Sequence, residues 1–196
     1  RRTSRAAFLS GTTSGIALVA NELQLVRMMS TEILRLMGMR DEVDARIEKA
    51  GAEVQHVRAL RPCLGPVTAA VVYAYLGAPS DYASAAALEK AAGLNLIERS
   101  SGDNDGTKHL SKRGPGIVRK YLFLAAMRLV QTDPVVKAWY QTRRSFKAEQ
   151  KAKALIAVER KLCRALFHVA AGNPFDATKL FDTRRLTLAA AKAEAA

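Results

Sequence analysis

The amino-acid sequence predicts a mainly α-helical protein: a long coiled-coil-like helix followed by a compact helical domain that contains a helix-hairpin-helix-like element. Two observations predict this class. Apolar residues from Met29 to Val57 recur at mostly alternating steps of three and four, the spacing of a coiled-coil seam. Beyond residue 60, shorter apolar segments repeat helical spacing and stop at glycine or proline. Hydrophobic residues make up 49% of the chain, which is enough for a real core.

These patterns divide the 196 residues into four parts. They are a mobile basic segment at 1–15, a long helix that acts as a coiled-coil connector at 16–59, the helical domain at 60–176 and a weakly ordered tail at 177–196.

The chain is strongly basic. Lys and Arg number 31 against 18 Asp and Glu, giving a net charge of +13 and a pI near 10.1, which favours partners with phosphate groups. No apolar run is long enough to cross a membrane. Cys63 and Cys163 lie far apart in apolar settings, as expected for buried thiols in a reducing compartment. Neither they nor the three histidines have metal-ligand spacing, so we expect no metal or cofactor in this chain and a cytoplasmic location.

The long helix is expected over residues 16–59. Arg40 interrupts its apolar seam, and Gly38 and Gly51 each weaken the helix by about 1 kcal/mol relative to alanine. Two interpretations remain open: a helix that pairs with a second copy of the chain, and a helix packed on its own domain. The apolar positions are Leu25, Met29, Ile33, Leu36, Val43, Ile47, Ala50, Val54 and Val57.

A glycine hairpin is expected next. The run from Arg61 to Pro66 breaks the pattern, and a small-residue helix follows and ends at Gly77. In a helix-hairpin-helix, backbone N–H groups of the hairpin hold a phosphate, which makes Gly65 a candidate nucleic-acid contact. Cys63 stands where such hairpins usually have their first glycine. Close packing of the two helices is the alternative role.

Four more helices are expected along the domain. One runs from Ala83 to Ala92, with Ser80 or Asp81 as its N-cap, and stops at Gly93. Another covers residues 117–130, and Asp133-Pro134 begins a third. Residues 154–171 return to helical spacing.

A polar, basic loop lies between these helices. Turn formers at residues 102–106 predict that regular structure stops there, directly after Ser100 and Ser101. Exposed hydroxyls beside cations suit a polyanion such as a nucleic-acid backbone. A solvated basic edge with no ligand is the alternative. The cations and imidazole that follow are Lys108, His109, Lys112, Arg113, Arg119 and Lys120.

A second basic stretch runs from Lys137 to Arg164, with nine cations against Glu149 and Glu159. Trp139, Tyr140 and Phe146 are interleaved, as expected where bases stack, although a core position is the stronger interpretation for Trp139. The candidate nucleic-acid contacts here are Arg143, Arg144, Lys147 and Lys151.

The ordered set of segments resembles the C-terminal transposase domain of the insertion-sequence-110 family, bacterial transposases that recombine DNA under the guidance of a structured bridge RNA. The resemblance covers roughly residues 60–175, and the preceding helix resembles that family's coiled-coil connector. One departure is Leu96, where the family usually has proline. The similar segments are residues 64–94, the Ser-Ser-Gly at 100–102, the Lys-Arg-Gly at 112–114, and residues 118–126, 133–141 and 153–167.

The resemblance implies a mechanism. A serine that precedes a glycine in this loop attacks a DNA phosphodiester and becomes covalently linked to it; the matching residue is Ser101, with Ser100 as the alternate nucleophile. Lys112, Arg113 and Arg119 are the candidates for neutralising the phosphate, and Lys108 and Lys120 for further nucleic-acid contacts. The implied partners are DNA, a structured guide RNA and further copies of the chain, in a bacterial, nucleoid-associated setting.

The resemblance also implies a part that this sequence does not match. The family's N-terminal half is a nuclease fold whose four acidic residues hold Mg²⁺, and no comparable acidic set precedes the long helix. We therefore expect the chain to bind nucleic acid without completing catalysis, either as part of a longer protein or as a degraded relative. A non-catalytic helical nucleic-acid-binding module and a structural helical adaptor are the alternative functions.

Overall fold

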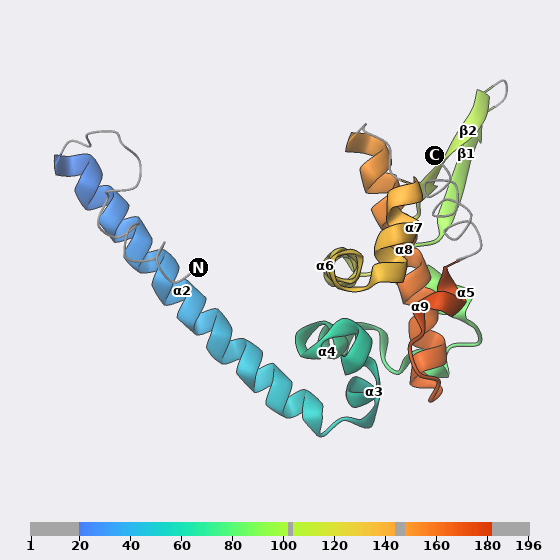
Figure 1. The fold of residues 1–196 in the computed structure, drawn as a ribbon, viewed down its shortest axis with the longest axis horizontal. Coiled ribbons are helices and arrows are strands. Elements are labelled where there is room, and N and C mark those ends of the chain that lie inside the picture. The colour runs from blue at the N-terminus through green and yellow to red at the C-terminus, as the bar shows by residue number, and fades with distance from the viewer. Residues whose placement is uncertain (1–19, 102–103, 144–147, 182–196) are drawn as a thin grey trace, which may run out of the picture. The chain divides into compact units, whose positions relative to one another are not determined.

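The computed structural model describes residues 20–101, 104–143 and 148–181, and for residues 20, 99–101, 104–107, 148 and 149 it describes the backbone only. It confirms the mainly helical class, with a long helix followed by a compact set of shorter helices (Figure 1). The chain forms two units, residues 1–49 and residues 50–196; the second is called the compact unit below.

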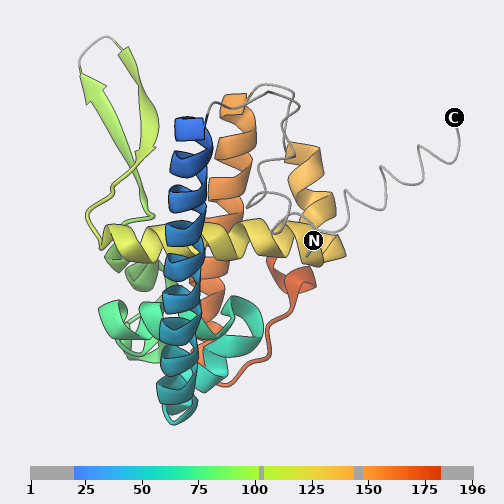
Figure 2. The ribbon, with the colours of Figure 1, turned by 90° about the vertical axis from the view of Figure 1, so that its left-hand side faces the viewer.

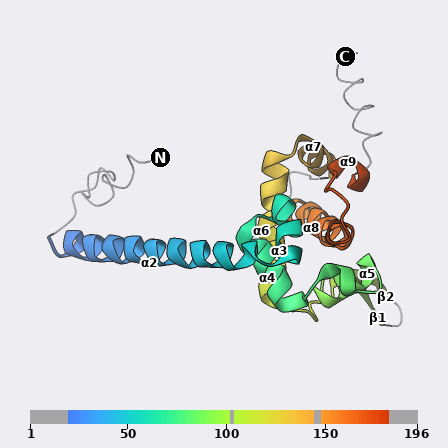
Figure 3. The same cartoon turned by 90° about the horizontal axis from the view of Figure 1, so that it is seen from below.

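The long helix is α2, Ala20–Ala52, which Figure 3 shows as one unbroken rod. Its 33 residues span about 50 Å at 1.5 Å per residue. The expectation of one helix over 16–59 is wrong at its C-terminal end, because the chain turns at Val54, whose backbone is extended. A Cβ atom on Gly51 would lie 3.0 Å from Val57, so the missing side chain lets the turned chain pack closely. Residues 16–19 lie outside the described ranges.

Helices α3, Gln55–Leu64, and α4, Pro66–Leu76, form a pair joined at Gly65 alone. Gly65 has a φ of 79°, which favours glycine. The predicted break at Arg61–Pro66 is therefore too early: Pro62 and Cys63 lie inside α3. Burial of Leu60, Cys63 and Leu64 stabilises this short helix despite the hydrogen bond that proline removes.

A 3₁₀ turn at Pro79–Asp81 leads to α5, Ala85–Ala91. The cap of α5 is Ser84, whose hydroxyl accepts a hydrogen bond from the Ala87 N–H at 3.1 Å, and not Ser80 or Asp81 as predicted. As predicted, the chain leaves this helix at Gly93, whose φ is 72°.

The segment expected to be a loop is an antiparallel ribbon. Strand β1, Leu96–Ser101, pairs with β2, Asn104–Leu110, in a register that places Leu96 opposite Leu110 and Ser101 opposite Asn104. Residues 102 and 103, between the two strands, lie outside the described residues. The ribbon extends beyond the neighbouring helices (Figure 2).

The remaining helices are α6, Gly116–Thr132; α7, Pro134–Arg143; α8, Ala148–Ala170; and α9, Ala177–Leu180. Asp133 caps α7 as predicted, because its Oδ1 accepts from the N–H groups of Val135 and Val136. The predicted weakly ordered tail begins too early: α9 is helical and Phe181 is buried against Trp139, with ring centroids 5.0 Å apart. This contact confirms that Trp139 is a core residue.

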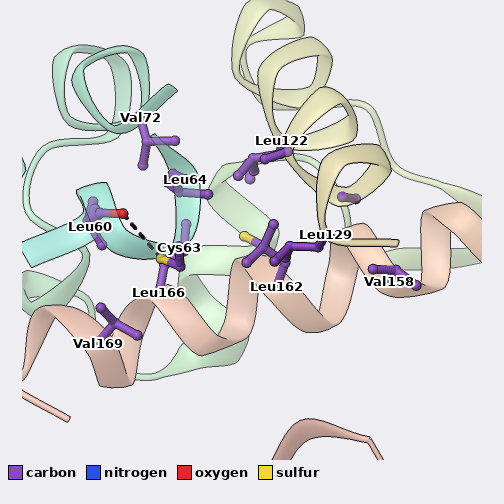
Figure 4. Packing of buried hydrophobic residues seen from close by; sticks show 14 of the residues in the cluster. Leu60, Cys63, Leu64, Val72, Leu122, Leu129, Val158, Leu162, Leu166 and Val169 are labelled. Atoms are coloured by element: carbon purple, nitrogen blue, oxygen red, sulfur yellow. Dashed lines mark hydrogen bonds between the residues drawn. The ribbon is translucent and has the colours of Figure 1, made fainter. Parts of the chain in front are cut away.

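Helix α8 is the centre of the compact unit and packs against α3, α5, α6 and α7. Figure 4 shows apolar side chains of α3, α4 and α6 gathered over Val158, Leu162, Leu166 and Val169 of α8. This core fixes one wall of the site described next.

Candidate nucleic-acid interface

The base of the ribbon is fixed to the end of α5 by backbone contacts. The Ser111 N–H donates to the Asn95 carbonyl, the Lys112 N–H donates to the Gly93 carbonyl, and the Ser111 hydroxyl donates to the Asn95 side chain. A Cβ atom on Gly114 would lie 2.1 Å from the Ala91 carbonyl oxygen, so only glycine permits this approach. The ribbon is thus anchored at its base rather than joined by a free loop.

Lys112 adopts a left-handed backbone, with a φ of 54°. This conformation costs a non-glycine residue about 1 kcal/mol. The hydrogen bond from its N–H to Gly93 holds the residue there, with its side chain exposed to solvent.

A groove of about 690 Å³ runs between the base of the ribbon and α8. Its lining combines apolar side chains with an imidazole and four cations, and no carboxylate belongs to the described residues that line it. The ribbon and the residues after it contribute Leu96, Ile97, Lys108, His109, Leu110, Ser111 and Lys112, and α8 contributes Lys153, Ile156, Ala157 and Arg160. Such a surface attracts polyanions.

A smaller hollow of about 350 Å³ adjoins the groove, because Lys153 and Ala157 line both. It is bordered by Arg143, whose guanidinium lies 5.2 Å from the centroid of the Trp139 ring. Trp139 also lines this hollow, but it is buried overall, so Arg143 is the more exposed residue of the pair.

Arg160 is held in the wall of the groove by an ion pair. Its Nε donates to Glu89 Oε1 at 2.7 Å, and the Glu89 side chain is only 5% exposed. Arg164 approaches the same carboxylate at 3.8 Å. Glu89 comes from α5 and both arginines come from α8, so the pair also joins the two helices.

Arg119 is not among the described residues that line the groove, and its guanidinium is bound to backbone. Its Nη1 donates to the Gly114 carbonyl and, at 3.5 Å, to the Ala92 carbonyl. These contacts hold the Gly114 loop against α5. A role for Arg119 in neutralising phosphate stays a prediction, and its guanidinium already has these two acceptors.

Glu159 is a buried carboxyl on α8, only 2% exposed, and its Oε1 has no hydrogen-bond partner within the described residues. Burial raises its pKa from an ordinary value of 4.5 to about 7, and the positive charge of Arg119 opposes part of this rise.

Both cysteines are buried, and burial disfavours their thiolate forms at neutral pH. Burial raises the pKa of Cys63 to about 11. Burial, assisted by the negative charges of Glu89 and Glu159, raises the pKa of Cys163 to about 12. Because the thiolate is the nucleophilic form, neither thiol competes with the serines for a nucleophilic role.

Ser101 is the last residue of β1, and Ser100 precedes it in the same strand; their side chains lie outside the described part of the structure. Arg144 and Lys147 lie outside it entirely. Lys108 and Lys112 both line the groove, and Arg143 borders the adjoining hollow. Arg113 and Lys151 are exposed.

Lys120 and Gly65 lie apart from the groove. Lys120 lines a separate hollow with Arg119 and Glu159. Gly65 is buried beneath Arg128: a Cβ atom there would lie 2.9 Å from Arg128 Nη1, and Nη2 donates to the Cys63 carbonyl. An arginine therefore covers the turn predicted to hold a phosphate.

Sequence reasoning did not select Lys153, Arg160 or Glu89 as site residues. Residues 153, 156, 157 and 160 have the spacing of one helix face, and this pattern could have indicated a shared surface. No sequence pattern indicates that Glu89 pairs with Arg160, because the two residues are 71 positions apart.

Comparison with known proteins supports the resemblance found in the sequence. Residues 61–141 match the model of the Transposase IS116/IS110/IS902 family. This segment runs from within α3 to within α7, so it includes the ribbon but ends before α8. The resemblance to the transposase domain of that family is thereby confirmed.

A curated relative from Streptomyces coelicolor (strain ATCC BAA-471 / A3(2) / M145) is described as "Insertion element IS110 uncharacterized 43.6 kDa protein". It is 28% identical over 106 residues, which are 54% of this chain and 26% of the relative. The chain thus matches about a quarter of the relative's length.

Two further findings concern the described ranges alone. No helix in them is both long and apolar enough to span a membrane. No group of three or more His, Cys, Asp or Glu side chains there is placed to hold a metal ion.

Proposed function

We propose that this chain is part of a DNA transposase or recombinase that cuts and rejoins DNA through Ser101 under the guidance of a structured RNA. The observation that supports this most directly is that one ribbon carries both features. Ser100 and Ser101 end β1 next to the turn, and a groove with four cations and no carboxylate in its described lining lies at the opposite end, the base, of the same ribbon. The family match covers that ribbon.

In the proposed reaction, the Ser101 hydroxyl attacks a DNA phosphorus atom. The Oγ–P bond forms, the bond from phosphorus to one DNA oxygen breaks, and the hydroxyl proton passes to a base while the leaving oxygen gains a proton. Reversal with a different DNA hydroxyl rejoins the strand. Lys108, Lys112 and the cations of α8 line the groove at the base of the ribbon and hold the flanking DNA backbone. Neutralisation of the non-bridging oxygens by Lys112 and Arg113 stays a prediction, because both residues follow the end of the ribbon away from Ser101.

The chain acts with partners in this proposal. A further domain supplies the acidic residues and Mg²⁺, and a second copy of the chain pairs along α2, where Leu25, Met29, Ile33 and Leu36 are exposed. The setting is the bacterial cytoplasm, in association with the nucleoid.

A non-catalytic nucleic-acid-binding module is the second candidate. The observation that favours it is the cationic lining of the groove, which binding to a nucleic-acid backbone accounts for without any chemical step. Both functions predict binding, but only the first predicts a covalent serine–DNA adduct when the acidic domain is supplied.

The first test is equilibrium binding to structured RNA, duplex DNA and single-stranded DNA between about 50 and 200 mM salt. If the four lining cations each neutralise one phosphate, the log–log slope on duplex DNA is about −3 to −4. Preference for one structured nucleic acid supports the transposase function. Equal, shallow binding to all three contradicts it and leaves a generic cationic surface.

Ser101→Ala is the companion variant. It should bind as the wild type does and form no adduct in the presence of the acidic domain. Loss of binding in this variant would assign Ser101 a contact role instead, and Ser100→Ala tests the alternate nucleophile.

A further inference from the structure

Arg160 differs from Lys108 and Lys112, two other cations of the groove, in its exposure and in the partner that holds it. Its Nε is bonded to Glu89, a carboxylate withdrawn from solvent, and its own side chain is 27% exposed. Lys108 and Lys112 are exposed on the opposite wall. One cation in this groove therefore has a fixed orientation supplied by a buried partner.

The contact through Nε leaves the rest of the guanidinium available. Within the described residues, the hydrogen bond of Arg160 to Glu89 uses the Nε–H alone, while Arg160 lines the groove. A guanidinium has five N–H donors in a rigid plane that match the oxygens of a phosphate. A side chain oriented before binding loses less rotamer freedom when it makes such contacts.

We propose that Glu89 is a positioning residue that orients Arg160 so that its Nη groups hold a phosphodiester at the base of the ribbon. This inference rests on the proposed function, because it assigns the groove a nucleic-acid backbone. Arg160 then fixes the register of the nucleic-acid strand relative to the ribbon, and the exposed Lys108 and Lys112 add attraction without a fixed direction.

Glu89→Gln gives a test in which two explanations predict opposite changes in the affinity for nucleic acid. The substitution removes one negative charge beside a basic groove, so general electrostatics predicts tighter binding of a polyanion. A positioning role predicts weaker binding, because a neutral amide holds the Arg160 Nε–H less strongly than a carboxylate does. We expect affinity for the nucleic acid that the wild type prefers to fall about fivefold, with an unchanged salt slope.

Glu98→Gln is the matched control. Glu98 is exposed on β1, opposite Lys108 in the register, and is not among the residues that line the groove. It removes the same charge near the same surface, so binding should stay unchanged or become slightly tighter.

A second pair of variants keeps the charge constant. Arg160→Lys retains one positive charge but has no planar fork, and should weaken binding about fivefold or more with a similar salt slope. Arg164→Lys changes an arginine that is 55% exposed and lies outside the groove lining, and should leave binding unchanged. Thermal melting of each variant shows whether the fold is retained.

The outcomes separate the two proposals. A wild type that binds none of the three probes overturns the proposed function, and this inference with it. A wild type that binds, with folded Glu89→Gln and Arg160→Lys proteins that bind equally well or better, overturns only the role of Glu89. If Glu89→Gln does not fold, Arg160→Lys against Arg164→Lys decides the same question.

Discussion

Helices α2 and α8 are both long and amphipathic, yet their apolar faces differ in how far they are buried. In α8, Val158, Leu162 and Leu166 are fully buried beneath neighbouring helices. In α2, the large apolar side chains are exposed, among them Met29 at 58% and Leu36 at 51%. The same sequence pattern thus identifies an apolar face in both helices, but it does not say what covers that face.

The difference has an energetic consequence. Burial of a leucine side chain contributes about 1.5–3 kcal/mol, so α8 is stabilised by its own domain. A helix without such packing relies on propensity and on pairs such as Glu32 with Arg35, whose ion pair is exposed and contributes little. The predictions below change one residue in either helix to test this contrast.

The largest effect is expected for Leu162→Ala in α8. Leu162 is 1% exposed at the centre of the core, and removing its side chain leaves a cavity between α8 and its neighbours. The free energy of unfolding should fall by about 2–5 kcal/mol, as measured by urea titration of the compact unit. A loss below about 1 kcal/mol would contradict the central position of α8.

A smaller, pH-dependent effect is expected for Glu159→Gln. Because the folded pKa of Glu159 is about 7 and its ordinary value is 4.5, the folded state binds the proton more tightly than the unfolded state. The wild type therefore loses stability as the pH rises from about 4.5 to 7, by about 3 kcal/mol at most, and the loss is complete above that range.

The glutamine variant lacks this titration. Its stability relative to the wild type should rise between about pH 4.5 and pH 7, as followed by thermal melting. A constant difference between the two proteins would show that the carboxyl titrates alike in the folded and unfolded states. Any fixed cost of burying the amide cancels in this comparison, because it does not change with pH.

The sequence predicted the helices well where proline, glycine or aspartate marks their ends, as at Gly77, Gly93 and Asp133. It failed where a pattern continued across a structural break. Val54 and Val57 keep the spacing of the α2 seam, yet they follow the turn, and Val57 packs in the core. The ribbon was missed because its strands are short and polar and enclose residues that sequence reasoning assigns to loops.

The candidate site was predicted in part for a similar reason. A run of cations indicates a basic surface but does not distinguish exposed Lys112 from Arg119, which is bound to backbone carbonyls. Nor does it indicate that Glu89 orients Arg160, because that pairing depends on how α5 packs on α8. Local sequence predicts charge and periodicity, whereas the partners of each charge depend on tertiary packing.

The smallest effect on folding is expected for Leu36→Ala in α2. Leu36 is half exposed and alanine favours helices, so unfolding of the compact unit should change by less than about 0.5 kcal/mol. The variant should instead weaken self-association, measured by sedimentation across a concentration series, since Leu36 lies on the seam proposed to pair with a second copy. A loss of stability comparable to that of Leu162→Ala, with no change in association, would mean that α2 is packed on its own domain. That result would remove the contrast between the two helices.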